Sequence, residues 1–116
     1  MSFAYVVRII IDDPSAFAAF VAWLRERHVA DVCAAGRCAG EIVVVDVPKD
    51  APRVVEARYR FASREAFAAY ERDHAPRLRS DGIAELARLG LEPGRSASLT
   101  RTTGPIVEIA AAPPPA

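Results

Sequence analysis

The chain has few cysteines, no excess charge of either sign and no long apolar run, and each absence excludes a class of protein. Two cysteines among 116 residues are too few for the disulfide framework of a small secreted domain, so we predict a cytoplasmic location. Fifteen basic and fifteen acidic residues cancel, which argues against a nucleic-acid-binding module or a polybasic membrane-surface module. No segment approaches the roughly 18 apolar residues of a membrane span. The first residues, MSFAYVVRIIIDD, lack the basic start and the cleavage site of a signal peptide.

Length and composition fit one folded domain. Apolar residues make up 52% of the chain, and a domain typically needs about 100–150 residues. Residues 1–109 are expected to form this domain. The Ala/Pro-rich residues 110–116 lack side chains that could pack into a core, and we predict that they form a disordered tail.

Strand and helix patterns alternate in the first part of the chain. Residues 3–11 carry apolar side chains at alternate positions, as in a strand covered on one face. Asp13 and Pro14 are typical of a helix start, and helical spacing of apolar residues follows. We expect this helix to end at the basic residues 25–28. Residues 29–40 are rich in small side chains and are predicted to form a connection.

The same order recurs in the second part. The predicted strands are residues 41–47, 53–61 and 95–103, with a short strand-like segment at 106–109. Residues 48–52, PKDAP, are predicted to form a turn. Ser63 is placed to cap a second helix, which Pro76 interrupts before it resumes.

This order of elements predicts a ferredoxin-like fold (βαββαβ), an antiparallel sheet with two helices on one face. The uncovered face would mix apolar with charged side chains: Val6, Ile10, Val54, Arg8, Arg58 and Arg60. A half-apolar open face on so small a domain favours a partner. A second copy, sheet facing sheet, is the simplest partner, so we predict a homodimer in the form of a dimeric α+β barrel.

Two stretches carry a resemblance to a known family. WLRERHVADVCAAGRCAG (residues 23–40) and YERDHAPRLRSDGI (residues 70–83) resemble a small bacterial family, the domain of unknown function 4286. The matching residues are Trp23, His28, Gly36, Tyr70, Ala75, Pro76, Arg77, Leu78 and Arg79. The departures are Ala30 for a proline, Ala35 for a threonine and Cys38 for an aromatic residue. The resemblance implies a dimeric α+β barrel of ferredoxin-like type, and it implies no reaction.

No metal site is expected. The possible soft ligands are His28, Cys33, Cys38 and His74, and their spacing contains no Cys-x-x-Cys knuckle of the kind that holds zinc. We interpret both cysteines as small buried hydrophobic residues. No cofactor is predicted.

His74 and Tyr70 form the candidate catalytic pair. They lie one helical turn apart, so His74 could act as acid or base and Tyr70 as a hydrogen-bond donor. The alternative is an amphipathic helix whose histidine bonds the carbonyl that Pro76 leaves free. His28 is a candidate ligand-binding residue or general base, and the alternative is a cap on the carbonyls at the end of the first helix.

Arg77 and Arg79 follow Pro76 and, two residues apart on a helix, point to different sides. We expect both to be largely solvated. Arg79 would then pair with Asp81 or Glu85, and Arg77 with Asp73. Solvated ion pairs of this kind contribute little to stability.

The charges on the open sheet face are the remaining candidates for ligand binding. A dimer would enclose Arg8, Arg58 and Arg60, and an enclosed charge must be paired or bound to a ligand. Arg8 can pair with Glu56 across adjacent strands. Arg58 or Arg60 would then be left to bind a carboxylate, and the sequence leaves both interpretations open.

Two functions therefore stay open. The preferred one is a homodimer without catalytic activity that binds a small molecule or a protein partner, because no acid, base and nucleophile can be assembled from these residues. The alternative is a cofactor-independent monooxygenase or isomerase acting on a small aromatic or acidic substrate, which rests on analogy of fold.

Overall fold

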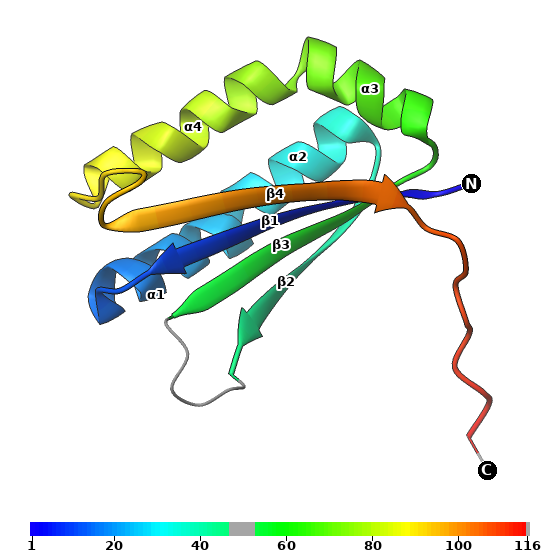
Figure 1. The fold of residues 1–116 in the computed structure, drawn as a ribbon, viewed down its shortest axis with the longest axis horizontal. Helices are drawn as coiled ribbons and strands as arrows, with labels where there is room; N and C mark the ends of the chain where they lie inside the picture. Colours follow the sequence, from blue (N-terminus) through cyan, green and yellow to red (C-terminus); the bar gives the residue numbers. More distant parts are fainter. Residues whose placement is uncertain (47–52, 116) are drawn as a thin grey trace.

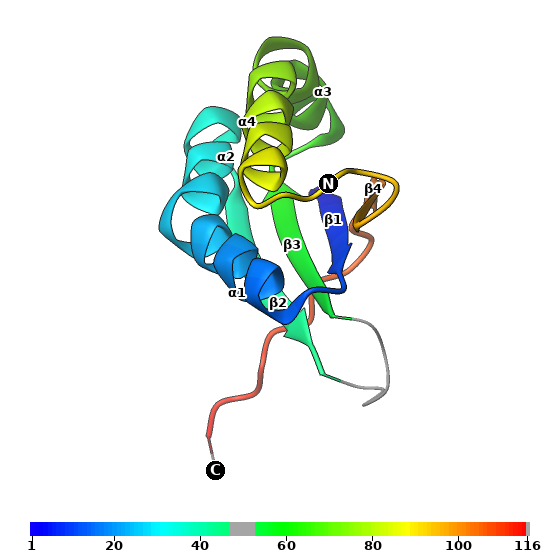
Figure 2. The same ribbon diagram turned by 90° about the vertical axis from the view of Figure 1, so that its left-hand side faces the viewer.

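The computed structural model describes residues 1–46 and 53–115. The strands are β1 (Phe3–Ile11), β2 (Ala39–Val45), β3 (Val54–Phe61) and β4 (Ala97–Pro105). The helices are α1 (Pro14–Trp23), the π-helical η1 (Leu24–His28), α2 (Val29–Gly36), α3 (Arg64–Asp73) and α4 (Ala75–Arg88). The strands form one antiparallel sheet in the order β2-β3-β1-β4, with the helices layered on one face (Figures 1 and 2). The predicted ferredoxin-like fold is confirmed.

The first helical region is longer than predicted. The expected end at residues 25–28 is wrong, because α1, η1 and α2 follow one another without a loop as far as Gly36. Val29 and Val32 are buried on one side of α2, and its alanines at positions 30, 34 and 35 are strong helix formers. The helix ends at Gly36, and the following Arg37 has a φ of 50° in the left-handed region. What was predicted as a connection is mostly helix.

The second helical region breaks where the sequence predicts. α3 ends at Asp73 and α4 begins at Ala75, with His74 between them in a non-helical conformation. Pro76 lies in the first turn of α4, where its missing N–H breaks no helical hydrogen bond. The Ser63 cap is confirmed, since its Oγ accepts from the Ala66 N–H at 3.0 Å. Asp13 caps α1 in the same way.

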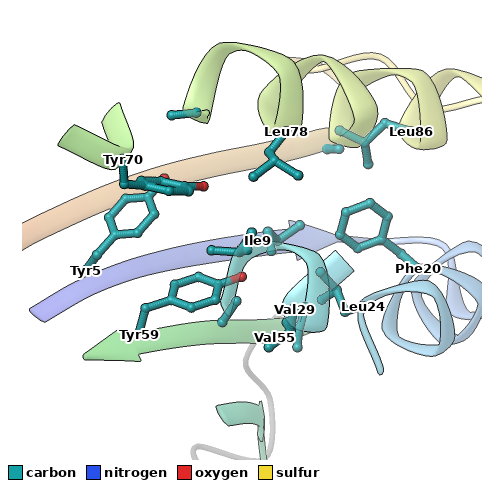
Figure 3. Packing of buried hydrophobic residues seen from close by; sticks show 14 of the residues in the cluster. Tyr5, Ile9, Phe20, Leu24, Val29, Val55, Tyr59, Tyr70, Leu78 and Leu86 are labelled. Atoms are coloured by element: carbon teal, nitrogen blue, oxygen red, sulfur yellow. The ribbon is translucent and has the colours of Figure 1, made fainter. Parts of the chain in front are cut away.

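The core lies between the sheet and the helices (Figure 3). Alternate strand residues face it, and the buried ones are Phe3, Tyr5, Ile9, Ile11, Val55, Ala57, Tyr59 and Phe61. The helices contribute buried residues that include Phe20, Leu24, Phe67, Tyr70, Leu78 and Leu86. This alternation follows from the period of two in a strand, which sends every second side chain to the same face.

None of the described helices lies over the opposite face of the sheet (Figure 2). The strand registers place Arg8 opposite Glu56, and Glu41 opposite Arg58, on this face. Apolar residues flank these charges, as the sequence predicts: Val6 and Ile10, which are half-buried, and Val54, which is buried. Because the helices are segregated to one side, any cover for this face must come from elsewhere.

The C-terminal part of the chain contains one predicted strand that forms and one that does not. β4 is confirmed, but residues 106–109 form no strand; Ile106 donates its N–H to the Ser2 carbonyl at 2.8 Å, and regular structure stops there. The turn predicted at residues 48–52 lies outside the described residues. Disorder of residues 110–116 stays a prediction. Among the described helices, none has the length and apolar character needed to cross a membrane.

Candidate functional site

A pocket lies between the helices and the covered face of the sheet. It contains a cavity of about 50 Å³, with walls from β1, β3, β4, α1, η1, α2, α3 and α4. The lining side chains that carry polar atoms are Tyr5, Tyr59, Tyr70, Trp23, His28, Arg79 and Arg101. Aliphatic residues fill most of the remaining wall, so the pocket is an apolar space with a small set of polar groups, as is usual for ligand sites.

Three tyrosines enter this space from β1, β3 and α3 (Figure 3). The rings of Tyr5 and Tyr59 stack with centroids 5.6 Å apart, and Tyr70 lies 6.4 Å from Tyr5. Burial raises the pKa of Tyr59 and of Tyr70, and neighbouring phenols add to the effect. Both hydroxyls therefore keep their protons and can donate hydrogen bonds, and the donor role of Tyr70 stays a prediction.

Arg79 turns toward the pocket, and the prediction that it is largely solvated is wrong. Its Nη2 donates to Glu71 Oε2 at 2.6 Å, instead of pairing with Asp81 or Glu85. Its Nε is buried and has no hydrogen-bond partner within the described residues. Burial lowers the pKa of this guanidinium, but the Tyr5 hydroxyl and the Glu71 carboxylate more than offset that effect and raise it. Arg79 is therefore a positively charged side chain held by Glu71, and its Nε–H can still donate a hydrogen bond.

His28 ends the π-helical turn η1, and π turns are frequent at functional sites. The cap interpretation of this residue is wrong, because the helix continues into α2. Its ring stacks on Trp23 with centroids 4.5 Å apart. Nδ1 is buried and has no partner within the part of the chain that is described. Burial lowers the pKa of His28, and Asp31 and Asp81 offset this only in part, so the ring is neutral at neutral pH and can accept a proton.

The structure does not bring His74 to this pocket. The residue links α3 to α4, and its ring centroid lies 6.5 Å from that of Tyr70. Tyr70 lines the cavity, whereas His74 is not among the described lining residues. A shared catalytic role for the two residues stays a prediction, and His28 is the histidine that meets Tyr70 in the same cavity.

The arginines of the open sheet face are largely ion-paired. Arg8 bonds Glu56 at 2.8 Å, as predicted, but Arg58 also bonds Glu56 at 2.7 Å and approaches Glu41 at 3.9 Å. The hydrogen bonds from Arg58 and then from Arg8 lower the pKa of Glu56. Arg60 forms no ion pair with another described residue, and it lines a hollow of about 360 Å³ beside Arg58. Arg60 is thus the open-face cation left for a ligand or a partner.

The cysteines form a pair of half-buried thiols. Cys33 and Cys38 are both free. Burial, followed by the neighbouring Cys33 thiol, raises the pKa of Cys38 to about 12, so this sulfur is a poor nucleophile and a poor metal ligand at neutral pH. Within the described residues, no three His, Cys, Asp or Glu side chains gather to hold a metal ion.

Sequence analysis missed several pocket residues. Tyr5 and Tyr59 were predicted only as covered strand residues, and Arg101 only as part of a strand. One signal was available: a tyrosine in place of a phenylalanine at a covered position carries a hydroxyl that needs a partner. For Arg79 the sequence held no such signal, because its direction depends on how α4 packs against β1.

Comparisons with known proteins bear on the family and the fold. The sequence profile of the domain of unknown function DUF4286 matches residues 2–87. No match was found among curated proteins. Solved structures do match: a dimeric ferredoxin-like protein from an uncultured marine organism has a TM-score of 0.67 and 14% identity, with 94% of this chain and 98% of that chain covered.

Two of the similar structures carry names that mention a reaction. A putative antibiotic biosynthesis monooxygenase from Deinococcus radiodurans has a TM-score of 0.60 at 13% identity, covering 98% of this chain and 100% of that chain. SnoaB, a cofactor-independent oxygenase from Streptomyces nogalater, has a TM-score of 0.50 at 12% identity, covering 93% and 95%. At these identities the likeness establishes the fold alone.

Proposed function

The chain belongs to the DUF4286 family, and we propose that it is a homodimeric α+β barrel protein that binds a small molecule between its helices and its sheet. The observation that carries this proposal is a pair of buried nitrogens, His28 Nδ1 and Arg79 Nε, that have no partner among the described residues and belong to two residues lining one pocket. A buried polar atom left unpaired costs about 1–3 kcal/mol. A bound ligand would satisfy both atoms.

Binding is favoured over catalysis by the chemistry of the lining. The tyrosine hydroxyls keep their protons, and the described lining residues include no Asp or Glu. Burial lowers the pKa of His28, so its neutral ring is the one candidate general base in the described lining. A single base without a nucleophile or an acid is a weak basis for a reaction.

The homodimer is proposed through the open face of the sheet. That face carries the half-buried Val6 and Ile10 around ion-paired charges, and no described helix covers them, so a partner sheet is a suitable cover. Similar structures are described as dimeric. A two-fold related copy would cover the same patch on both chains, as closed dimers require. Location in the cytoplasm remains a prediction from the low cysteine content.

Replacing Ile10 with aspartate is expected to convert the dimer to a monomer. The substitution places a charge on the apolar part of the open face, where a partner sheet would bury it without a counter-ion. Light scattering coupled to gel filtration at micromolar concentration measures the mass. The control is Ala68→Asp on the exposed side of α3, which adds the same charge and should leave the mass unchanged. A monomeric wild type would refute the dimer.

The binding function is tested by a thermal-shift screen of small molecules on wild type and on Leu99→Trp. Leu99 is half-buried and lines the cavity, so a larger side chain there should occupy the ligand's place. A compound at 100 times its Kd stabilises the folded state by about 2.7 kcal/mol. We expect such compounds to raise the Tm of wild type and of the surface control Val107→Trp, but not of Leu99→Trp. Equal shifts in all three proteins would place the binding site elsewhere.

A second candidate function is a cofactor-independent monooxygenase or isomerase. The observation in its favour is His28, a neutral base on the pocket wall, in a fold shared with proteins named as oxygenases. Oxygen uptake with bound compounds separates the oxygenase from the binding protein. A binding protein should show no uptake above the protein-free rate, whereas uptake that His28→Gln abolishes would favour the oxygenase.

A further inference from the structure

Arg79 presents an unused donor at the pocket. Glu71 accepts from Nη2 at 2.6 Å and the Tyr5 hydroxyl lies beside the guanidinium, while Nε is buried and has no acceptor of good geometry within the described residues. A guanidinium offers parallel N–H groups that match the two oxygens of a carboxylate. An arginine held at one end, with its Nε–H unpaired among the described residues, can receive an acceptor from a ligand.

The charge of the lining selects for an anion. Arg79 and Arg101 both line the pocket, and no carboxylate does so among the described residues. The hydroxyls of Tyr59 and Tyr70 stay protonated and add donors. Glu71 is not a lining residue, but its ion pair with Arg79 at 2.6 Å offsets part of this positive charge. An anion would still meet Arg101, the Nε–H of Arg79 and the tyrosine hydroxyls, whereas a cationic ligand would meet no carboxylate in the described lining.

The walls favour a flat ring. Tyr5 stacks with Tyr59 at a centroid distance of 5.6 Å, and Trp23 stacks with His28 at 4.5 Å. Aromatic surfaces favour aromatic partners in offset or edge contacts, which contribute about 0.5–1.5 kcal/mol beyond the burial of area. An aromatic ring of the ligand would thus pack against the aromatic side chains of the pocket, with its acidic group directed to Arg79.

The size of the space limits the ligand to a small one. A cavity of about 50 Å³ holds a few water molecules at most, so a ligand must widen it. A side chain able to move lies at its mouth, where Ile83 is 55% exposed. Gly82 beside it has no side chain, and a Cβ there would lie 4.0 Å from Trp23. Entry is thus expected between α4 and Trp23, and a single ring is the largest ligand that modest movements would admit.

We infer that the ligand is a small aromatic carboxylate, with its ring among the pocket aromatics and its carboxylate on Arg79. This inference rests on the proposed binding function and names the ligand class for that site.

The test titrates isotope-labelled protein with benzoate and follows binding by NMR. Wild type and the control Arg77→Gln, which alters an exposed arginine on the same helix, should bind benzoate equally. Arg79→Gln should bind it at least about 10-fold more weakly, since a hydrogen bond to a charged group contributes about 1.5–3 kcal/mol. Saturating benzoate should shift the Arg79 Nε–H resonance of wild type. Benzylamine keeps the aromatic ring but carries a positive charge, and cyclohexanecarboxylate keeps the carboxylate but has no flat ring. Both should bind wild type more weakly than benzoate does.

Other results overturn the inference. Equal affinity of Arg79→Gln and Arg77→Gln for benzoate would refute the role of Arg79 in binding the carboxylate. Binding of benzylamine or cyclohexanecarboxylate as tight as that of benzoate would refute an aromatic carboxylate as the ligand class. If Arg79→Gln does not fold, the wild type alone still tests the role of Arg79. An Arg79 Nε–H resonance that does not shift at saturating benzoate would refute binding of the carboxylate to Arg79. Binding of benzyl alcohol but not of benzoate refutes the carboxylate and leaves the binding function standing. Silence from every probe and from the wider screen refutes both.

Discussion

Replacing Phe61 with alanine is expected to lower the free energy of unfolding by about 3–5 kcal/mol. Phe61 is fully buried at the end of β3. Its ring packs edge-on against Phe67 at a centroid distance of 5.1 Å and lies 5.3 Å from Tyr70. Truncation removes the buried ring and leaves a cavity that β3 and α3 cannot collapse to fill. The whole free energy of unfolding of a domain is only about 5–15 kcal/mol. The loss would therefore be a large share of its stability.

Urea unfolding followed by circular dichroism measures this loss. The control is Ile83→Ala on α4, where the side chain is 55% exposed and truncation should cost well under about 1 kcal/mol. The slope of the free energy of unfolding against urea concentration should be the same for both variants, because unfolding exposes the same area of surface in each. A Phe61→Ala protein as stable as Ile83→Ala would show that the β3–α3 contact is not part of the core.

Replacing Gly36 with alanine is expected to destabilise the fold by about 1–3 kcal/mol, although alanine is the better helix former. A Cβ at position 36 would lie 2.6 Å from Phe61 Cε1 and 3.3 Å from Tyr70 Cδ1. Both rings are buried, so neither can move aside without disturbing its neighbours. The end of α2 therefore approaches β3 more closely than any residue with a side chain allows.

A second helical glycine provides the matched comparison. At Gly82 in α4 the nearest side-chain atom to an added Cβ is Trp23 at 4.0 Å, an ordinary contact. Gly82→Ala should therefore raise the free energy of unfolding by about 0.5–1 kcal/mol, the gain in helix propensity. Thermal unfolding should show shifts in Tm of opposite sign for the two variants. A stabilising Gly36→Ala would contradict the close approach of α2 to the sheet.

The two large effects are expected to be coupled. Removing the Phe61 ring also removes the atom that an added Cβ at Gly36 would strike. The double variant should therefore be less destabilised than the sum of the two single variants, and neighbouring residues commonly show such interaction energies of about 0.5–3 kcal/mol. Additive losses would mean that the clash at position 36 lies elsewhere.

Features governed by neighbours in the chain were predictable. The alternation in residues 3–11, the Asp13 and Ser63 caps and the break at Pro76 all depend on the conformations of a few adjacent residues. The Arg8–Glu56 pair was also predictable, since strand order and alternation together place the two on one face. Local chemistry thus led to the ferredoxin-like fold.

The course of residues 29–36 was not predictable from local pattern. The small side chains there are compatible with a loop or with a helix, and burial of Val29 and Val32 against the sheet decides for the helix. The same packing makes His28 an interior residue of one long helical region and presents it to the pocket. Local propensity was too weak to choose between two conformations of similar energy.

By itself, the sequence determined the order of the strands and helices, their main caps and the charged, half-apolar face of the sheet. Only the tertiary structure decided which polar side chains meet. Tyr70 and His28 line one cavity, whereas His74 does not line it although its ring lies 6.5 Å from that of Tyr70. Arg79 bonds Glu71, and its Nε has no partner among the described residues. The physical reason is that capping and alternation act between chain neighbours, whereas the pocket is assembled by contacts between β1, η1 and α4, whose distances depend on packing of the whole core.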